Sequence, residues 1–189
     1  MSNLQNIEPK KVFKWFYELN QIPRCSGDEK RASDFLVNFA KERNLEVYQD
    51  EAYNVIIKKQ ASKGYENSDP VIIQGHMDMV CIKGEGSNHD FTKDPIEIIV
   101  QDDIMRANNT TLGGDDGIAV AYGLAILDSD DLKHPLIELL VTTSEETGMD
   151  GAHALTNEHL SGKILLNIDS EEEGVFLVSC AGGANIITT

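Results

Sequence analysis

The spacing of apolar residues near the start of the chain predicts two amphipathic helices. In residues 9–20 the apolar side chains recur at the helical interval, at Val12, Phe16 and Leu19. Further on, one helical face collects Ala32, Phe35, Leu36, Phe39 and Ala40. Ser26 and Glu29 stand ahead of this second set in the pattern of a capping box, which predicts that their side chains cap the second helix.

Shorter apolar runs predict a sheet. Residues 45–50 and 54–59 are typical of two strands around a short turn, and residues 91–107 suggest a further hairpin. Nearly continuous apolar runs, which are typical of strands covered by helices on both faces, occupy residues 71–75, 136–143 and 163–169.

A stretch rich in small residues separates the first two of these runs. Glycine and alanine recur through residues 117–127, so a helix here can approach its neighbours closely, and we expect a buried crossover helix. Strands that alternate with such a helix are typical of an α/β fold. The sequence therefore predicts one α/β domain with a mostly parallel, mixed sheet flanked by helices.

Composition excludes several classes of function. With 189 residues, of which 41% are hydrophobic and 25% charged, the chain can bury a full core. No apolar stretch approaches the roughly 20 residues of a membrane span, and residues 1–16 lack the pattern of a secretory signal, so we expect a cytoplasmic protein without a membrane partner. The net charge of −16 opposes binding to nucleic acid.

The cysteines give no sign of a cross-link. Cys25, Cys81 and Cys180 are odd in number, widely spaced and never in a CxxC pair. This usage argues against both a disulfide framework and a cysteine zinc cluster. We expect reduced, mostly buried thiols.

Acidic and imidazole side chains follow the ends of the apolar strands or precede the crossover helix. Their positions are His76, Asp78, Asp115, Asp116, Glu145, Glu146 and Asp169. Functional groups of open α/β sheets gather at the carboxyl ends of the strands. So many carboxylates at one edge would repel one another severely without a divalent metal.

The residue types indicate which metals suit this edge. Residues two apart in an extended stretch point to the same side, so His76 can ligate a metal while Asp78 orients its imidazole. Imidazole and carboxylate ligands suit zinc, and also manganese or cobalt. The surplus of carboxylates points to two ions with a spare carboxylate as general base, and the neighbours Glu145 and Glu146 fit that division.

Simpler interpretations of the same residues stay open. Asp78 could cap a turn, and Asp115 with Asp116 could be helix N-terminal carboxylates favoured by the macrodipole. The glycines beside them resemble a phosphate cradle, although two aspartates there would repel phosphate. Cys81 fits a packing role. We expect surface or capping roles for the remaining histidines, His89, His134, His153 and His159.

Four motifs, HMDMV, TLGGDDGIAVAYGLAIL, SEETGMDGA and NIDSEEEG, occur in this order along the chain. This series resembles that of the aminoacyl-histidine (Xaa-His) dipeptidases, within the superfamily of co-catalytic zinc aminopeptidases, carboxypeptidases and aminoacylases. The resemblance implies a zinc-peptidase-like catalytic domain that binds two divalent ions, zinc by preference. It implies as metal ligands His76, Asp115, Glu146 and Asp169.

The resemblance also implies the roles of individual residues. Asp115 would bridge the two ions, and the peptide bond that follows it is often cis in this superfamily. Asp78 would be the partner of His76, and Glu145 would be the general base. The expected reaction is hydrolysis of dipeptides, Xaa-His dipeptides included, by a hydroxide held between two metals.

The resemblance covers nearly all of this chain but less than half of the usual length of the family. It implies that residues 1–189 are the N-terminal portion of the catalytic domain. The lid domain through which family members form homodimers, a lid histidine, and a C-terminal segment with one more metal-binding histidine would lie outside it. Three alternatives stay open: a metal-binding fragment without turnover, an aminoacylase or carboxypeptidase of the same superfamily, and a nucleotide-binding module.

Overall fold

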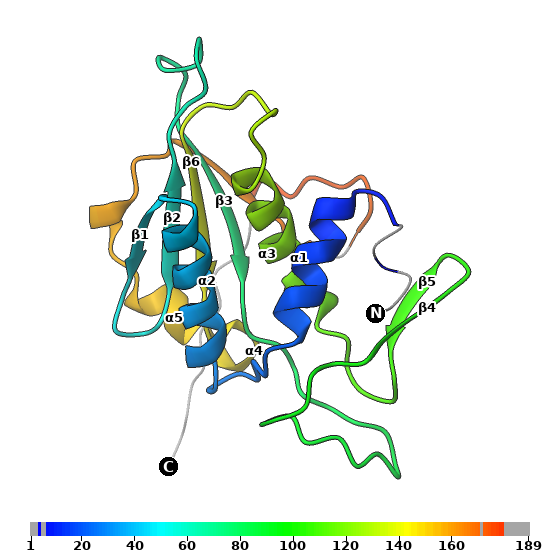
Figure 1. Cartoon of the computed structure of the whole chain (residues 1–189). Helices are drawn as coiled ribbons and strands as arrows, with labels where there is room; N and C mark the ends of the chain where they lie inside the picture. The colour runs from blue at the N-terminus through cyan, green and yellow to red at the C-terminus, as the bar shows by residue number, and fades with distance from the viewer. Residues whose placement is uncertain (1–3, 5–6, 171, 180–189) are drawn as a thin grey trace, which may run out of the picture.

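The computed structural model describes residue 4, residues 7–170 and residues 172–179, and Figure 1 shows how their helices and strands are arranged. The helices are α1 (Lys10–Asn20), α2 (Lys30–Glu42), α3 (Gly114–Leu127), α4 (Glu145–Gly148), α5 (Asp150–Ala154) and the 3-10 helix η2 (Asn157–His159). The strands are β1 (Glu46–Gln49), β2 (Val55–Lys59), β3 (Val71–His76), β4 (Ile98–Gln101), β5 (Ile104–Ala107), β6 (Ile137–Thr142) and β7 (Ile164–Asn167).

The main sheet has five strands in the order β1-β2-β6-β3-β7. Strands β6, β3 and β7 are parallel, and β1 and β2 join them in antiparallel pairing. His76 pairs with Thr142, so the carboxyl ends of β3 and β6 lie at the same edge. The predicted mixed sheet is confirmed, and β4 with β5 forms the predicted separate hairpin.

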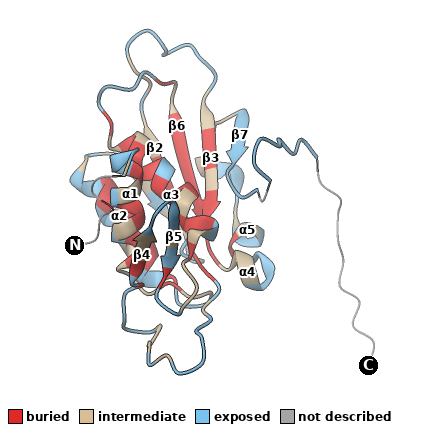
Figure 2. Ribbon diagram, turned by 90° about the vertical axis from the view of Figure 1, so that its right-hand side faces the viewer, coloured by how far each residue is buried: buried red, intermediate tan, exposed pale blue. Residues whose placement is uncertain are grey.

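The three long helices lie on one side of the sheet, where α2 and α3 contact its strands and α1 packs against α3. Figure 2 shows α1, α2 and α3 on one side of the strands, with α4 and α5 on the other. Helix α3 lies close against the sheet, because Gly123 has no side chain and a Cβ there would collide with Leu139 of β6. The predicted buried crossover helix is therefore confirmed, and its small residues are what permit the contact.

The other face is less well covered than the sequence predicted. Ile56, Ile72 and Leu140 form a small buried cluster there, with Leu155 and Leu160 packed against it. Strand β7 lies at the edge of the sheet, and its side chains Ile164, Leu165 and Leu166 are 48%, 54% and 49% exposed. The prediction of helices on both faces is wrong for β7 within the described residues, because an apolar run has the same appearance in a central strand and in an edge strand.

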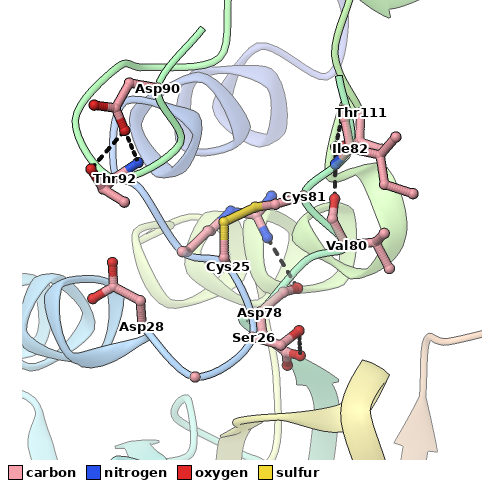
Figure 3. Close-up of a disulfide and its surroundings, with 12 residues drawn as sticks. Cys25, Ser26, Asp28, Asp78, Val80, Cys81, Ile82, Asp90, Thr92 and Thr111 are labelled. Carbon is pink, nitrogen blue, oxygen red and sulfur yellow. Dashed lines mark hydrogen bonds between the residues drawn. A yellow bond between two sulfur atoms is a disulfide. The ribbon is translucent and has the colours of Figure 1, made fainter. Parts of the chain in front are cut away.

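Cys25 and Cys81 form a disulfide, so the expectation of three reduced thiols is wrong for this pair. The two Cα atoms are 5.6 Å apart, within the usual range for a disulfide. The backbone brings the two segments together, because the Met79 amide donates to the Arg24 carbonyl at 3.1 Å. Figure 3 shows the bond beside Ser26 and Asp78. Cys180 lies outside the described residues.

Helices long and apolar enough to cross a membrane are not found among the described residues.

Reduction of the Cys25–Cys81 disulfide should destabilise the fold. The bond joins residues 56 positions apart, so it restricts the unfolded chain, and its loss should lower the free energy of unfolding by about 2–4 kcal/mol. Urea unfolding with and without dithiothreitol measures this change. A double variant, Cys25→Ser with Cys81→Ser, should not respond to the reductant. An unchanged midpoint for the unaltered chain would contradict the prediction.

Candidate metal centre

The centre lies where four separate segments meet at one edge of the main sheet. His76 ends β3, and Asp115 stands at the start of α3. Glu145 and Glu146 open α4, which follows β6 after two residues, and Asp169 follows β7. Ligand atoms within 4.8 Å of one another occur in three groups: His76 with Glu145 and Asp169, His76 with Asp115 and Glu146, and Asp115 with Asp116 and Asp169. The structure thus brings together all the ligands selected from the sequence, while their roles stay predictions.

His76 is buried within the cluster and is 1% exposed. Its Nδ1 atom is 3.1 Å from the Asp78 carbonyl oxygen and 3.3 Å from Asp78 Oδ1. Its Nε2 atom faces the other carboxylates, 3.0 Å from Asp115 Oδ1 and 3.9 Å from Glu145 Oε2. Asp78 therefore holds one side of the ring, and the other nitrogen points toward the candidate ligands, as a metal-binding histidine requires.

Asp78 is fully buried and connects β3 with the start of α4. Its Oδ1 accepts the Glu145 amide at 3.1 Å, and its Oδ2 accepts the Glu146 amide at 3.3 Å and the Ser26 hydroxyl at 2.8 Å. Burial raises the pKa of Asp78, but its hydrogen bonds with His76, Ser26 and the Glu145 amide outweigh burial and lower this pKa below its ordinary value. Asp78 is thus a charged acceptor that fixes both glutamates.

Asp115 and Asp116 lie in different surroundings although they are neighbours. The peptide bond between them is cis, as the family resemblance implied, and their backbone is not helical, so the regular part of α3 begins at Gly117. The Asp115 side chain is 70% exposed at the cluster. Asp116 is 2% exposed, and its Oδ2 accepts the His76 amide at 3.2 Å. Burial raises the pKa of Asp116 to about 8.

Burial and the neighbouring carboxylates shift the pKa values of several residues in the cluster. Burial first, and then the neighbouring carboxylates, raise the pKa values of both Glu145 and Glu146 above their ordinary value. Burial alone would lower the pKa of His76, but the hydrogen bond with Asp78 and the charges of Asp78 and Asp116 raise it to about 9. A divalent cation would relieve this repulsion, and one imidazole with several carboxylates is a suitable donor set for zinc or manganese.

A cavity adjoins the cluster on the side of β6 and β7. Glu145 and Asp169 contribute to its wall, and the apolar part of that wall consists of Leu140, Met149, Ala152, Leu155 and Leu165. The candidate ligands and an apolar recess are therefore next to each other, as in many small-molecule sites.

Three residues that the sequence analysis did not place at the centre help to build it. The Arg24 guanidinium is 1% exposed and donates to the carbonyl oxygens of Met77, Asp78 and Gly113. The predicted capping box is wrong: α2 begins at Lys30 without a side-chain cap. Ser26 donates to Asp78 instead, and Glu29 accepts from Ser144. Their spacing was a visible signal, but it indicated a local role.

The other histidines stay apart from the three candidate ligand groups. His134 is 8% exposed and its Nδ1 lies 2.7 Å from the Pro135 carbonyl oxygen, so the expectation of a surface or capping role is wrong for this residue. His159 stacks on Tyr48, with ring centroids 3.6 Å apart.

Comparison with known proteins places this geometry in context. No protein-family model matches the chain. The cytosol non-specific dipeptidase of Escherichia coli strain K12 is 42% identical over 183 residues, which are 97% of this chain and 38% of that protein. The crystal structure of an aminoacylhistidine dipeptidase from Vibrio alginolyticus matches with a TM-score of 0.89 and 42% identity, over 92% of this chain and 35% of that one.

A tripeptidase structure from Staphylococcus aureus shares the fold at 24% identity, with a TM-score of 0.72 over 88% of this chain and 44% of that one. These matches confirm the predicted fold class. The chain spans less than half the length of each of these three relatives.

The stability of the metal-free chain should fall as pH rises from 6 to 9. Asp116 and His76, with folded pKa values of about 8 and about 9, keep protons that the unfolded chain, with pKa values near 4 and 6.5, has already released. The folded state binds more protons in this window, so deprotonation favours unfolding. Urea unfolding with a chelator at pH 6, 7.5 and 9 measures the slope. An Asp116→Asn variant should show a shallower slope, and a flat or rising profile for the unaltered chain would contradict the prediction.

Proposed function

We propose that this chain, a relative of the aminoacylhistidine dipeptidases as its motifs predicted, provides the metal-binding centre of a peptidase that hydrolyses dipeptides. The observation that carries the proposal is the meeting of one imidazole and several carboxylates, from four segments, in groups whose ligand atoms lie within 4.8 Å of one another. The names of the two relatives at 42% identity support dipeptides as the substrate class, and dipeptides that end in histidine are included.

The donor groups favour two divalent ions. His76 and Asp169 would hold one ion, Glu146 would hold the other, and Asp115 would bridge them. Asp115 and Asp169 each occur in two of the three close groups and His76 also occurs in two, which supports ligand sharing. Bound divalent ions supply a water of lowered pKa and polarise the scissile carbonyl.

Glu145 is the proposed general base. Its carboxylate is at the cluster, 3.9 Å from His76 Nε2, and its backbone is fixed by Asp78. A general base must accept a proton from water and pass it to the leaving amine, and a carboxylate at the edge of the donor cluster is placed to do so. Glu146 faces Asp115 and His76 in another of the close groups, so the two neighbouring glutamates have different surroundings.

A second candidate function is metal binding without turnover. The chain spans 38% and 35% of the two relatives at 42% identity, so the activity of those whole proteins is a proposal for this chain. Both functions need the same ligands, and they differ in whether a dipeptide is cleaved.

A Glu145→Gln variant separates ligand from base. We expect it to keep the metal content of the unaltered chain and to lose dipeptide hydrolysis by about 100-fold or more, because the amide accepts no proton. Glu146→Gln should instead lose bound metal. The measurements are metal content after dialysis against zinc or manganese, and hydrolysis of an Xaa-His dipeptide, other dipeptides and an N-acylated amino acid.

Each outcome decides between the candidates. Metal binding without hydrolysis by the unaltered chain would favour the second function. Cleavage of the N-acylated amino acid alone would favour an aminoacylase. Loss of metal from Glu145→Gln would exchange the roles of the two glutamates, and an unaltered chain that binds no divalent ion would contradict the proposal itself.

A further inference from the structure

We infer that Glu29 is a positioning residue, which holds Ser144 and thereby fixes the Glu145 and Glu146 carboxylates at the candidate metal centre. The inference rests on the proposed function for its chemical meaning, but its geometry is independent of any metal. Glu29 does not occur in the close donor groups among the described residues. It therefore acts through the backbone that carries the ligands and does not act as a ligand itself.

The Glu29 carboxylate accepts hydrogen bonds from Ser144, the residue that precedes α4. It is 5% exposed, and its Oε1 atom accepts the Ser144 amide at 3.0 Å and the Ser144 hydroxyl at 2.8 Å. The same oxygen accepts the Gly27 amide at 2.9 Å. A buried carboxylate is costly unless it is well satisfied, so three donors on one oxygen make this contact specific. The two partners are 115 residues apart in the sequence.

Ser144 needs such support because of its backbone. Its φ of 50° lies in the left-handed region, which a residue with a Cβ adopts at a cost unless its surroundings hold it there. This conformation turns the chain from β6 into α4. A relaxed Ser144 would therefore redirect both of the glutamates that follow it.

Two carboxylates hold the same turn from its two ends. Glu29 binds Ser144, while Asp78 accepts the amides of Glu145 and Glu146. Ser26, three residues before Glu29, donates to Asp78. The segment 26–29 thus contacts the turn directly through the Glu29 carboxylate, and indirectly through Ser26, which donates to Asp78. These contacts explain why two polar residues lie in this segment without capping α2.

The test compares Glu29→Ala with Glu29→Gln in the 189-residue chain. The glutamine variant keeps an oxygen in the Oε1 position and so can accept all three hydrogen bonds, whereas the alanine variant accepts none. Asp28→Asn is the matched control, because Asp28 is an exposed neighbour that pairs with Arg31. The readouts are amide hydrogen exchange of the metal-free chain and titration with zinc or manganese.

We expect Glu29→Ala to speed exchange of the amides of residues 144–148 by about tenfold or more, with exchange in β3 and β6 unchanged. It should also weaken the weaker of the two divalent-ion sites by about tenfold to 100-fold, as loss of a supporting residue around a metal does. Glu29→Gln and Asp28→Asn should stay within about twofold of the unaltered chain in both readouts. Ser144→Ala, which removes one of the donors, should speed exchange by about threefold and serves if Glu29→Ala fails to fold.

Several results would overturn the inference. One is unchanged exchange at residues 144–148 in Glu29→Ala, or in Ser144→Ala where the first variant does not fold. Another is a rise in exchange throughout the chain, since that marks a general loss of stability. A third is faster local exchange with unaltered metal affinity. If the unaltered chain binds no metal while local exchange responds as expected, the positioning of the turn stands and the proposed function fails.

Discussion

The candidate centre depends on the buried guanidinium group of Arg24. The Arg24 guanidinium donates to the carbonyl oxygens of Met77 at 2.9 Å, Asp78 at 3.2 Å and Gly113 at 2.7 Å. It therefore ties the loop after β3 to the loop before α3. Burial lowers the pKa of Arg24 to about 10, while the charges of Asp78 and Asp116 act in the opposite direction, so the group stays cationic near neutral pH. A fixed positive charge thus lies behind the acidic cluster and keeps two of its segments together.

The carboxylates of the centre divide between support and reactivity. Asp78 is buried, hydrogen-bonded and charged, and it serves the geometry of its neighbours. Glu145 and Glu146 are less buried, their pKa values are raised, and they face the ligand atoms of the cluster. Carboxylate groups therefore have pKa shifts of opposite direction within one site. The contrast follows from hydrogen bonding, because Asp78 accepts several donors while the two glutamates face other carboxylates.

Periodicity was enough to predict the elements that place the centre. The helical spacing of Val12, Phe16 and Leu19 led to α1, and the apolar runs led to β3, β6 and β7. The convergence of the acidic residues followed from parallel strands ending at one edge. Local patterns could not reveal contacts between distant segments: the Cys25–Cys81 bond, and the partners of Ser26 and Glu29. These were missed because a residue's spacing in sequence says nothing about a neighbour more than 50 positions away.

The exposed edge strand has a consequence for how far the main sheet can extend. In the part of the chain that the structure describes, β7 pairs on one side with β3, and Ile164, Leu165 and Leu166 leave it apolar on both faces. An edge of this kind can accept one more strand, because the backbone groups on its far side are available for pairing. Among the described residues, β7 is therefore an edge at which the main sheet can be extended.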